Sequence, residues 1–411
     1  MTHNKFSNYL TFIARWIAIL FPFILFCGNA LVDIAISTIA VLFLLNCYLK
    51  KDYKWTNNGW FVAALTFWGY AVLRSFFTEN PTIALASTLP FCRFFLFAAA
   101  IAFWLFKDIK THKPLFLSLI LCISVVSLDA IFQYIVGFDF FGNIPVDNST
   151  YVRLVNFAGK QSIGITLASI SFLSVAHFID LLNNKDSSYK QKAISISFLL
   201  IAFLAVMLSG ERTAFLMMIL GYAILLWKVR IYKRLLLLKV MAVAVLALIA
   251  VITTNSMVLE RQIKKSYQEI ENFESSSYGR IFHTGLELFK QNPIFGIGSK
   301  HFQSECDKMP NPDSHYYCST HPHNIYIQML TEFGIIGFAL FLFMLFNIAK
   351  LCWHYKTNLC KDSIAFAAFL SFWFKYIPII STSSYFIAWS VAPSWFMLGI
   401  LITRFQQNAK A

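Results

Sequence analysis

The sequence predicts an all-α integral membrane protein with about twelve transmembrane helices and one large, partly helical outward loop. Of its 411 residues, 58% are hydrophobic and only 13% are charged, and the mean hydropathy is +0.63. Soluble domains are roughly half apolar and about a quarter charged. The composition therefore excludes a soluble protein, and the net charge of +14 needs an explanation other than binding to nucleic acid.

About twelve apolar stretches are long enough for a bilayer core, which needs about twenty residues per helix. They cover residues 10–29, 31–48, 59–77, 83–106, 114–136, 163–182, 193–210, 213–229, 235–254, 334–353, 363–381 and 384–403. The first lacks a convincing small-residue cleavage site, so we expect a retained helix and not a signal peptide. Residues 1–254 then hold helices 1–9, residues 255–333 form a loop, and residues 334–411 hold the last helices and a cytoplasmic tail.

Basic residues follow every second predicted span. They are Lys50, Lys51, Lys54, Lys107, Lys110, Lys113, Lys185, Lys190, Lys192, Lys228, Arg230, Lys233, Arg234, Lys356, Lys361, Arg404 and Lys410. Connections rich in lysine and arginine stay on the cytoplasmic side of a membrane. Both termini are therefore expected to be cytoplasmic, and the other connections are expected to face outward.

Two of the outward connections are long, at about 137–162 and 255–333. The second has internal order: a charged, helix-compatible stretch is followed by an amphipathic helix over 278–291, which Pro293 and nearby glycines end. A further short helix is expected over 325–333. Polar loops outside the membrane contact both water and lipid headgroups, so we expect binding or catalysis in these two loops.

Cys306 and Cys318 lie in the large outward loop, while most other cysteines lie in or near the spans. In an oxidising periplasm they are candidates for a disulfide, which would contribute about 3 kcal/mol in the chain-entropy model. The alternative is two free thiols. The cysteines and histidines of the loop fit no compact zinc motif, so no metal site is predicted.

A cluster of polar residues, Ser319-Thr320-His321-Pro322-His323-Asn324, lies at the end of this loop, beside a long apolar stretch. Imidazole has an unperturbed pKa close to neutrality and is therefore a natural general base or acid. The alternative is a helix start, with Asn324 or a histidine as a polar cap. The sequence leaves both interpretations open.

Several cations lie on the predicted outer face, against the positive-inside trend. Arg212 occupies a short outward turn, Arg280 opens the amphipathic helix, and Arg153 and Lys160 lie in the other outward loop. Such a gathering indicates an anionic ligand, and phosphate suits a planar guanidinium. The alternative for Arg212 is neutralisation by its neighbour Glu211.

Arg74 and Arg93 lie at or below the outer boundary of the membrane. For these two, snorkelling or an internal ion pair is the favoured interpretation.

Taken together, these residues resemble the O-antigen ligase and polymerase superfamily of bacterial envelope enzymes. The carrying motif is His323-Asn324, nine residues, Gly334, two residues and Gly337, which matches the pattern His-[Asn/Ser/Gln]-x9-Gly-x2-Gly of the ligases. The resemblance covers roughly residues 150–340. Two further matches are Arg212-x3-Leu216 in a Ser-Gly-x-Arg turn, and Arg280 opening a helix that ends at Pro293 and Gly296-Ile-Gly298.

The resemblance implies a donor glycan on undecaprenyl pyrophosphate and an acceptor sugar hydroxyl on the lipid A core of lipopolysaccharide. His323 would be the general base, Arg212 and Arg280 would clamp the pyrophosphate, and His321 would orient the base or bind donor. Lys160, Arg153 and Asn324 complete the predicted binding residues. The reaction would be an inverting displacement at the periplasmic face of the inner membrane, with membrane lipid around the donor tails and with no metal, nucleotide or other cofactor.

Other functions fit the same pattern. A polymerase of the superfamily would extend the lipid-linked glycan, and a protein O-oligosaccharyltransferase would use a serine or threonine hydroxyl as acceptor. A transporter of lipid-linked or anionic substrates belongs to another class. Carriers often have repeated halves, whereas this chain has no visible repeat and its polar mass lies on one face.

Overall fold

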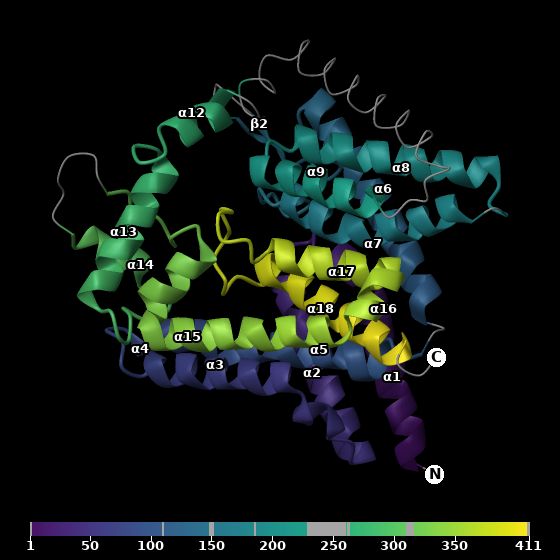
Figure 1. The fold of residues 1–411 in the computed structure, drawn as a ribbon, viewed down its shortest axis with the longest axis horizontal. Helices are drawn as coiled ribbons and strands as arrows, with labels where there is room; N and C mark the ends of the chain where they lie inside the picture. The colour runs from purple at the N-terminus through teal and green to yellow at the C-terminus, as the bar shows by residue number, and fades with distance from the viewer. Residues whose placement is uncertain are drawn as a thin grey trace.

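The structure is a computed structural model that describes residues 2–108, 111–147, 152–184, 186–227, 260, 264–309 and 316–408. It is mainly α-helical, as predicted (Figure 1). Most helices run side by side in a bundle, and three helices from the large loop, α12 to α14, lie at one end of it. We call residues 264–309 and 316–324 the outer segment.

The helices of the first half are α1 (Thr2–Ile24), α2 (Asn29–Lys50), α3 (Gly59–Ser75), α4 (Pro81–Thr88), α5 (Cys92–Ala100), α6 (His112–Val136), α7 (Ile163–Asn183), α8 (Tyr189–Leu208) and α9 (Arg212–Trp227). Single turns at Lys54–Asn57, Leu89–Phe91 and Ile101–Leu105 interrupt or extend them. The other outward loop also forms a small antiparallel hairpin of β1 (Val146–Asp147) and β2 (Val152–Arg153), which was not predicted.

The later helices are α12 (Lys265–Glu271), α13 (Ser277–Gln291), α14 (Phe302–Asp307), α15 (Ile325–His354), α16 (Lys356–Lys361), α17 (Ser363–Phe374) and α18 (Ala388–Asn408). The amphipathic helix expected over 278–291 is thus α13. It ends just before Pro293, whose ring cannot continue a helix.

Seven helices are long and apolar enough to cross a membrane among the described residues. They are Lys5–Ile24, Asn29–Lys50, Pro81–Leu105, His112–Val136, Ile163–Leu181, Tyr189–Leu208 and Ile325–His354. α9 and α17 are shorter apolar helices, and the span expected over 235–254 lies outside the described residues. The chain is therefore an all-α protein with several candidate membrane spans, while the count of about twelve stays a prediction.

One part of the predicted layout is wrong. Spans were expected over 363–381 and 384–403, but α17 ends at Phe374 and α18 begins at Ala388. The connection between them, residues 375–387, is not helical. It contains Pro378, which disfavours a helix at the preceding residue, and then four hydroxyl residues in a row. We call this connection the strap.

The bundle has a large apolar core built mainly from aromatic and alanine side chains. α18 contacts α17, α5, α7 and α2 and contributes the buried Trp395 and Phe396. The outer segment has a second, much smaller core of Ile281, Leu288, Ile297, Phe302 and Cys306. Helices in a membrane are held together by close packing of such side chains, and the outer segment has far fewer of them than the bundle has.

The outer segment joins the bundle where α15 is broken. Gly334 has φ 64° and ψ −168° inside this helix, and residues 293–298 run beside the break. Backbone hydrogen bonds connect the two, from Ile297 N to Thr331 O at 2.9 Å and from Ile335 N to Pro293 O at 2.8 Å. The predicted boundary between the loop and the last helices, after residue 333, lies inside α15 and stays a prediction.

Arg74 of α3 fixes the same junction. Its Nε and Nη2 donate to the carbonyl oxygens of Phe295 and Gly296 at 3.0 and 2.7 Å, and Nη1 donates to Phe77 O at 2.6 Å. Arg74 therefore binds backbone carbonyls instead of snorkelling, and it forms no ion pair with any of the residues that the structure describes. Arg93, by contrast, forms the expected internal pair with Asp33.

Candidate active site

His323 lies one residue before the N-cap of α15 and has a left-handed backbone, with φ 54°. This conformation is uncommon for a residue other than glycine and marks positions that the surrounding structure fixes. Its Nε2 lies 3.2 Å from Ser319 Oγ. The ring of Tyr278, from the first turn of α13, meets the imidazole edge to face at 5.9 Å. The imidazole is thus held between the end of the loop and α13.

Asn324 is the N-cap of α15. Its Oδ1 accepts from the backbone N–H groups of Tyr326 and Ile327 at 2.9 and 3.2 Å, and its Nδ2 donates to Pro378 O at 2.6 Å. Asn324 is buried, so it fulfils the helix-start interpretation. The two interpretations of the cluster coexist, because the cap sets the direction of the helix while His323 remains beside it. A contact between Asn324 and substrate stays a prediction.

His321 packs against His323, with 4.1 Å between the ring centroids. It is only 7% exposed, and its Nδ1 lies 2.9 Å from Thr320 Oγ1. Burial is the main cause that lowers the pKa of His321 to about 3, with smaller contributions from His323, Lys300 and Lys375, while the backbone of Thr382 acts to raise it. Its imidazole is therefore neutral at physiological pH.

His323 is also a neutral base at physiological pH. Burial is the main cause that lowers its pKa below the ordinary value, and the charge of Arg153 is the second. A neutral imidazole can accept a proton, whereas an imidazolium cannot. The surroundings of His323 therefore favour the protonation state that a general base requires.

The strap holds the histidine cluster from the bundle side. Thr382 N donates to His323 O at 2.7 Å, next to the bond between Asn324 and Pro378. Further bonds join the start of α15 to the strap, from Tyr326 Oη to Tyr376 O, from Tyr385 N to Gln328 Oε1 and from Gln328 Nε2 to Ser384 Oγ. Figure 1 shows the strap, in yellow, reaching toward the loop that precedes α15.

Arg153 lies in β2, against the turn that precedes α9. A Cβ on Gly210 would lie 2.6 Å from Val152 O and 3.4 Å from Arg153 Cγ, so the glycine allows this close approach. Arg153 interacts electrostatically with both His323 and Glu211. It therefore links the two outward loops at the histidine.

Glu211 does not neutralise Arg212. Its carboxylate accepts from the backbone N–H groups of Gly164 and Ile165 at 2.7 and 3.1 Å and so caps the start of α7. Burial raises the pKa of Glu211, while Arg153 and these two hydrogen bonds lower it. The alternative that Glu211 neutralises Arg212 was wrong, because the Glu211 carboxylate is bound to the start of α7 and not to its sequence neighbour.

Arg212 pairs instead with Glu269 of α12, with 2.8 Å between Nη2 and Oε2. The arginine side chain is 15% exposed, and its Nη1 is buried with no hydrogen-bond partner among the described residues. The Glu269 carboxylate thus occupies one edge of the guanidinium. The N–H groups of Nη1 remain able to donate to a ligand.

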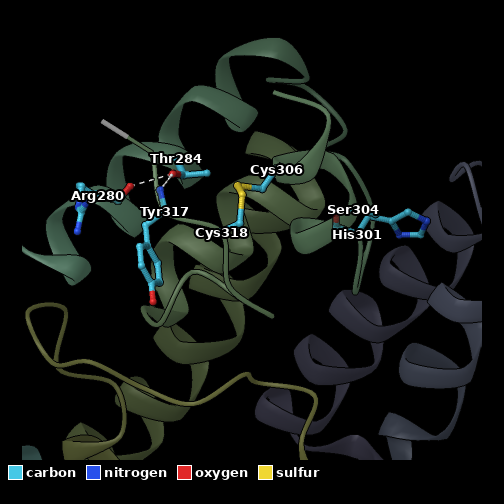
Figure 2. The surroundings of a disulfide bond; sticks show 7 residues. All are labelled: Arg280, Thr284, His301, Ser304, Cys306, Tyr317 and Cys318. Atoms are coloured by element: carbon cyan, nitrogen blue, oxygen red, sulfur yellow. Dashed lines mark hydrogen bonds between the residues drawn. A yellow bond between two sulfur atoms is a disulfide. The ribbon is translucent and has the colours of Figure 1, made fainter. Parts of the chain in front are cut away.

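Arg280 lies in the first turn of α13, and its guanidinium stacks over the Tyr317 ring at 5.5 Å (Figure 2). Tyr317 N donates to Thr284 Oγ1 at 3.2 Å. The next residue, Cys318, forms the predicted disulfide with Cys306, with 5.6 Å between the Cα atoms. The disulfide and the contacts of Tyr317 together fix the chain that leads into Ser319 and His323.

The predicted residues thus fall into three groups. His323, His321, Asn324 and Arg153 are brought together, and Arg280 lies two residues after Tyr278, which touches His323. Arg212 lies at the α12 contact. Lys160 lies in an exposed turn, and no described contact joins its side chain to the histidines. The binding roles of Arg212, Arg280 and Lys160 stay predictions.

Four residues of the site were missed: Tyr278, Ser319, Lys300 and Lys375. Lys375 had a detectable signal, because a lysine inside a predicted span is costly and usually functional. Tyr278 and Ser319 had none, since a tyrosine at a helix start and a serine in a loop are ordinary. The site thus combines neutral imidazoles with guanidinium and ammonium groups. The cations suit an anionic ligand, and an imidazole can accept a proton.

The chain is similar to known proteins over part of its length. An uncharacterized protein from Haemophilus influenzae (strain ATCC 51907 / DSM 11121 / KW20 / Rd) is 25% identical over 218 residues, which cover 49% of this chain and 51% of that protein. The match thus spans about half the length of the curated relative. Residues 197–342, which include Arg212, Arg280 and His323, match the family described as O-Antigen ligase. The segment that carries the site belongs to the O-antigen ligase superfamily.

Proposed function

We propose that the protein is an O-antigen ligase, which transfers a glycan from undecaprenyl pyrophosphate to a sugar hydroxyl of the lipid A core. The observation that carries the proposal is His323: a half-buried, neutral imidazole at a conformationally fixed position, within the matched segment. Its contact with Ser319 Oγ at 3.2 Å is the distance at which an acceptor hydroxyl would bind a general base.

In the proposed step, His323 takes the proton of the acceptor hydroxyl as its oxygen attacks the anomeric carbon. The bond from that carbon to the pyrophosphate oxygen breaks, and its electron pair leaves with the pyrophosphate. Attack opposite the leaving group inverts the anomeric configuration. A positioned general base accelerates such a step by about 10²–10⁴, and the chain supplies it without a nucleotide.

The leaving group gains negative charge, which cations must stabilise in the transition state. Arg212 and Arg280 are the proposed clamp, because planar guanidiniums bind phosphate oxygens in pairs. Glu269 now occupies one edge of Arg212, so the donor would take the place of this carboxylate or bind at the free Nη1. The proposed site faces the periplasm from the inner membrane, with both termini cytoplasmic.

The test uses the purified full chain in lipid vesicles with undecaprenyl-pyrophosphate glycan and lipid A-core acceptor. Product is followed by gel shift for wild type, His323→Ala and the control His283→Ala. His283 is an exposed histidine of α13 that touches Tyr316 and Glu287. We expect transfer by wild type and the control, and a loss of at least about a hundredfold in His323→Ala.

Three outcomes would change the proposal. Equal transfer by His323→Ala would remove His323 as the base. Lengthening of the lipid-linked glycan without transfer to the core would identify a polymerase. Movement of the lipid-linked glycan across the vesicle membrane with no new glycosidic bond would identify a transporter.

A further inference from the structure

Lys375 is the first residue of the strap and lies directly after α17. Its Nζ donates to Ser390 Oγ of α18 at 2.5 Å. No carboxylate forms an ion pair with it within the part of the chain that the structure describes. Burial lowers the pKa of Lys375 to about 7, so an anion bound beside it would favour the charged form. An ammonium has three donor hydrogens, so the hydroxyl of Ser390 leaves two to be used.

Three other cations of the site have a carboxylate near them. Arg212 forms an ion pair with Glu269, and Arg153 interacts electrostatically with Glu211. Lys300 interacts in the same way with Glu332, a buried carboxylate of α15. A charge removed from water is costly unless it is paired. Lys375 differs from these three cations, because no carboxylate among the described residues acts on it.

Lys375 also lies near the histidine cluster. The strap that it begins is hydrogen-bonded to His323 and Asn324, and His321 interacts electrostatically with Lys375. His321 Nε2 is buried and forms no hydrogen bond of good geometry among the described residues, although the backbone of Thr382 lies near the ring. A buried imidazole nitrogen without a good hydrogen bond costs free energy, so His321 Nε2 and the Lys375 ammonium both have hydrogen-bonding capacity that an anion could use.

We propose that Lys375 and His321 form a phosphate-binding subsite, in which Lys375 pairs with an anionic oxygen of the donor pyrophosphate and His321 Nε2–H donates to the same phosphoryl group. This inference rests on the proposed function, since it names two further residues that bind its donor. A pyrophosphate has two phosphoryl groups, and cations from different elements can share it.

A purely structural role for Lys375 predicts something else. If Lys375 only joins the strap to α18, the bond to Ser390 is what matters. Lys375→Gln keeps a donor near Ser390 but removes the charge, whereas Lys375→Arg keeps the charge. Lys356→Gln is a matched control, because Lys356 is an exposed lysine on α16 that lies over the Trp353 ring.

The experiment measures binding of a short-chain isoprenyl pyrophosphate to the purified full chain, with the corresponding isoprenyl alcohol as the phosphate-free control. A hydrogen bond to a charged group contributes roughly tenfold or more in affinity. We therefore expect Lys375→Gln to raise Kd by at least about tenfold, Lys375→Arg to stay within about threefold, and Lys356→Gln to match wild type.

A second measurement uses only wild type and so does not depend on whether a variant folds. An amine-reactive acylating reagent is applied with and without the isoprenyl pyrophosphate, and each lysine is read by mass spectrometry. We expect the ligand to slow acylation of Lys375 and to leave Lys356 unchanged.

The outcomes separate this inference from the proposed function. If wild type binds the pyrophosphate but Lys375→Gln binds it equally, or if Lys375 is not protected, the subsite is wrong and the donor class stands. If wild type binds the pyrophosphate no better than the alcohol, the proposed donor and the subsite are both overturned.

Discussion

The bundle and the outer segment are held together by different means. The bundle buries a continuous core of large aromatic side chains, and in a membrane such a core stabilises the bundle through close van der Waals packing between helices. The outer segment has five residues in its core and relies on particular bonds: the disulfide, the carbonyls held by Arg74, and the backbone pairing beside Gly334. His323 lies where the two parts meet, so its position depends on those particular bonds more than on the bulk of the core.

The largest effect is expected from Gly334→Ala, which breaks the junction itself. A Cβ there would lie 2.3 Å from Ile294 O, at a φ of +64°. An alanine would therefore strain its own backbone, and its Cβ would clash with the backbone of Ile294. We expect a loss of about 3 kcal/mol or more and no transfer. Thermal unfolding of the purified variant measures the stability.

Gly69→Ala in α3 is the matched control, because a Cβ there meets nothing within 4 Å. In a helix this change is neutral or favourable by up to about 1 kcal/mol. Equal melting temperatures for the two variants would show that the junction is not a weak point.

The next largest effect is expected from Cys306→Ser with Cys318→Ser, which loosens the outer segment and leaves the bundle intact. The disulfide contributes about 3 kcal/mol in the chain-entropy model. Hydrogen exchange should rise in α13 and α14, while α5 and α18 keep their protection. Cys360→Ser, at an exposed free cysteine, is the control. Faster exchange throughout the bundle would contradict the proposed independence of the two parts.

A smaller effect is expected from Arg74→Lys, which keeps the charge but cannot make all three bonds to carbonyl oxygens. We expect transfer to fall and the unfolding free energy to drop by about 1–3 kcal/mol. Arg15→Lys is the comparison, since Arg15 forms a partly exposed pair with Asp108 at 3.3 Å, and such pairs contribute about 0–1 kcal/mol. The assignment fails if both variants behave alike in the transfer assay.

The smallest effect is a change in pH dependence within the site. The base acts when neutral, so kcat/KM falls as pH falls through the pKa of His323 in the free enzyme. Because burial and Arg153 lower this pKa, we expect the acid limb of wild type to have its midpoint below the ordinary histidine value. Arg153→Gln removes one lowering charge and should move the midpoint to higher pH. An unmoved midpoint would mean that Arg153 does not act on His323.

The same contrast explains which features the sequence could predict. The helix over 278–291 and the disulfide follow from local patterns, because helical periodicity and cysteine spacing act over a few residues. The strap was missed, since apolar residues continue through most of 363–403 and outweigh Pro378 in a hydropathy window. The partners of Arg74 and Arg212 lie far away in the chain, at Phe295 and Glu269, and one sequence contains no signal for such pairs.

The hydrogen bonds of the strap also bear on how the chain is made. His323 receives its bond from Thr382, which comes later in the chain. A ribosome therefore makes the histidine before it makes the strap that holds the histidine's backbone. A chain that stops before the strap would carry His323 without this support, so we expect it to be inactive in the transfer assay even though the histidine is present.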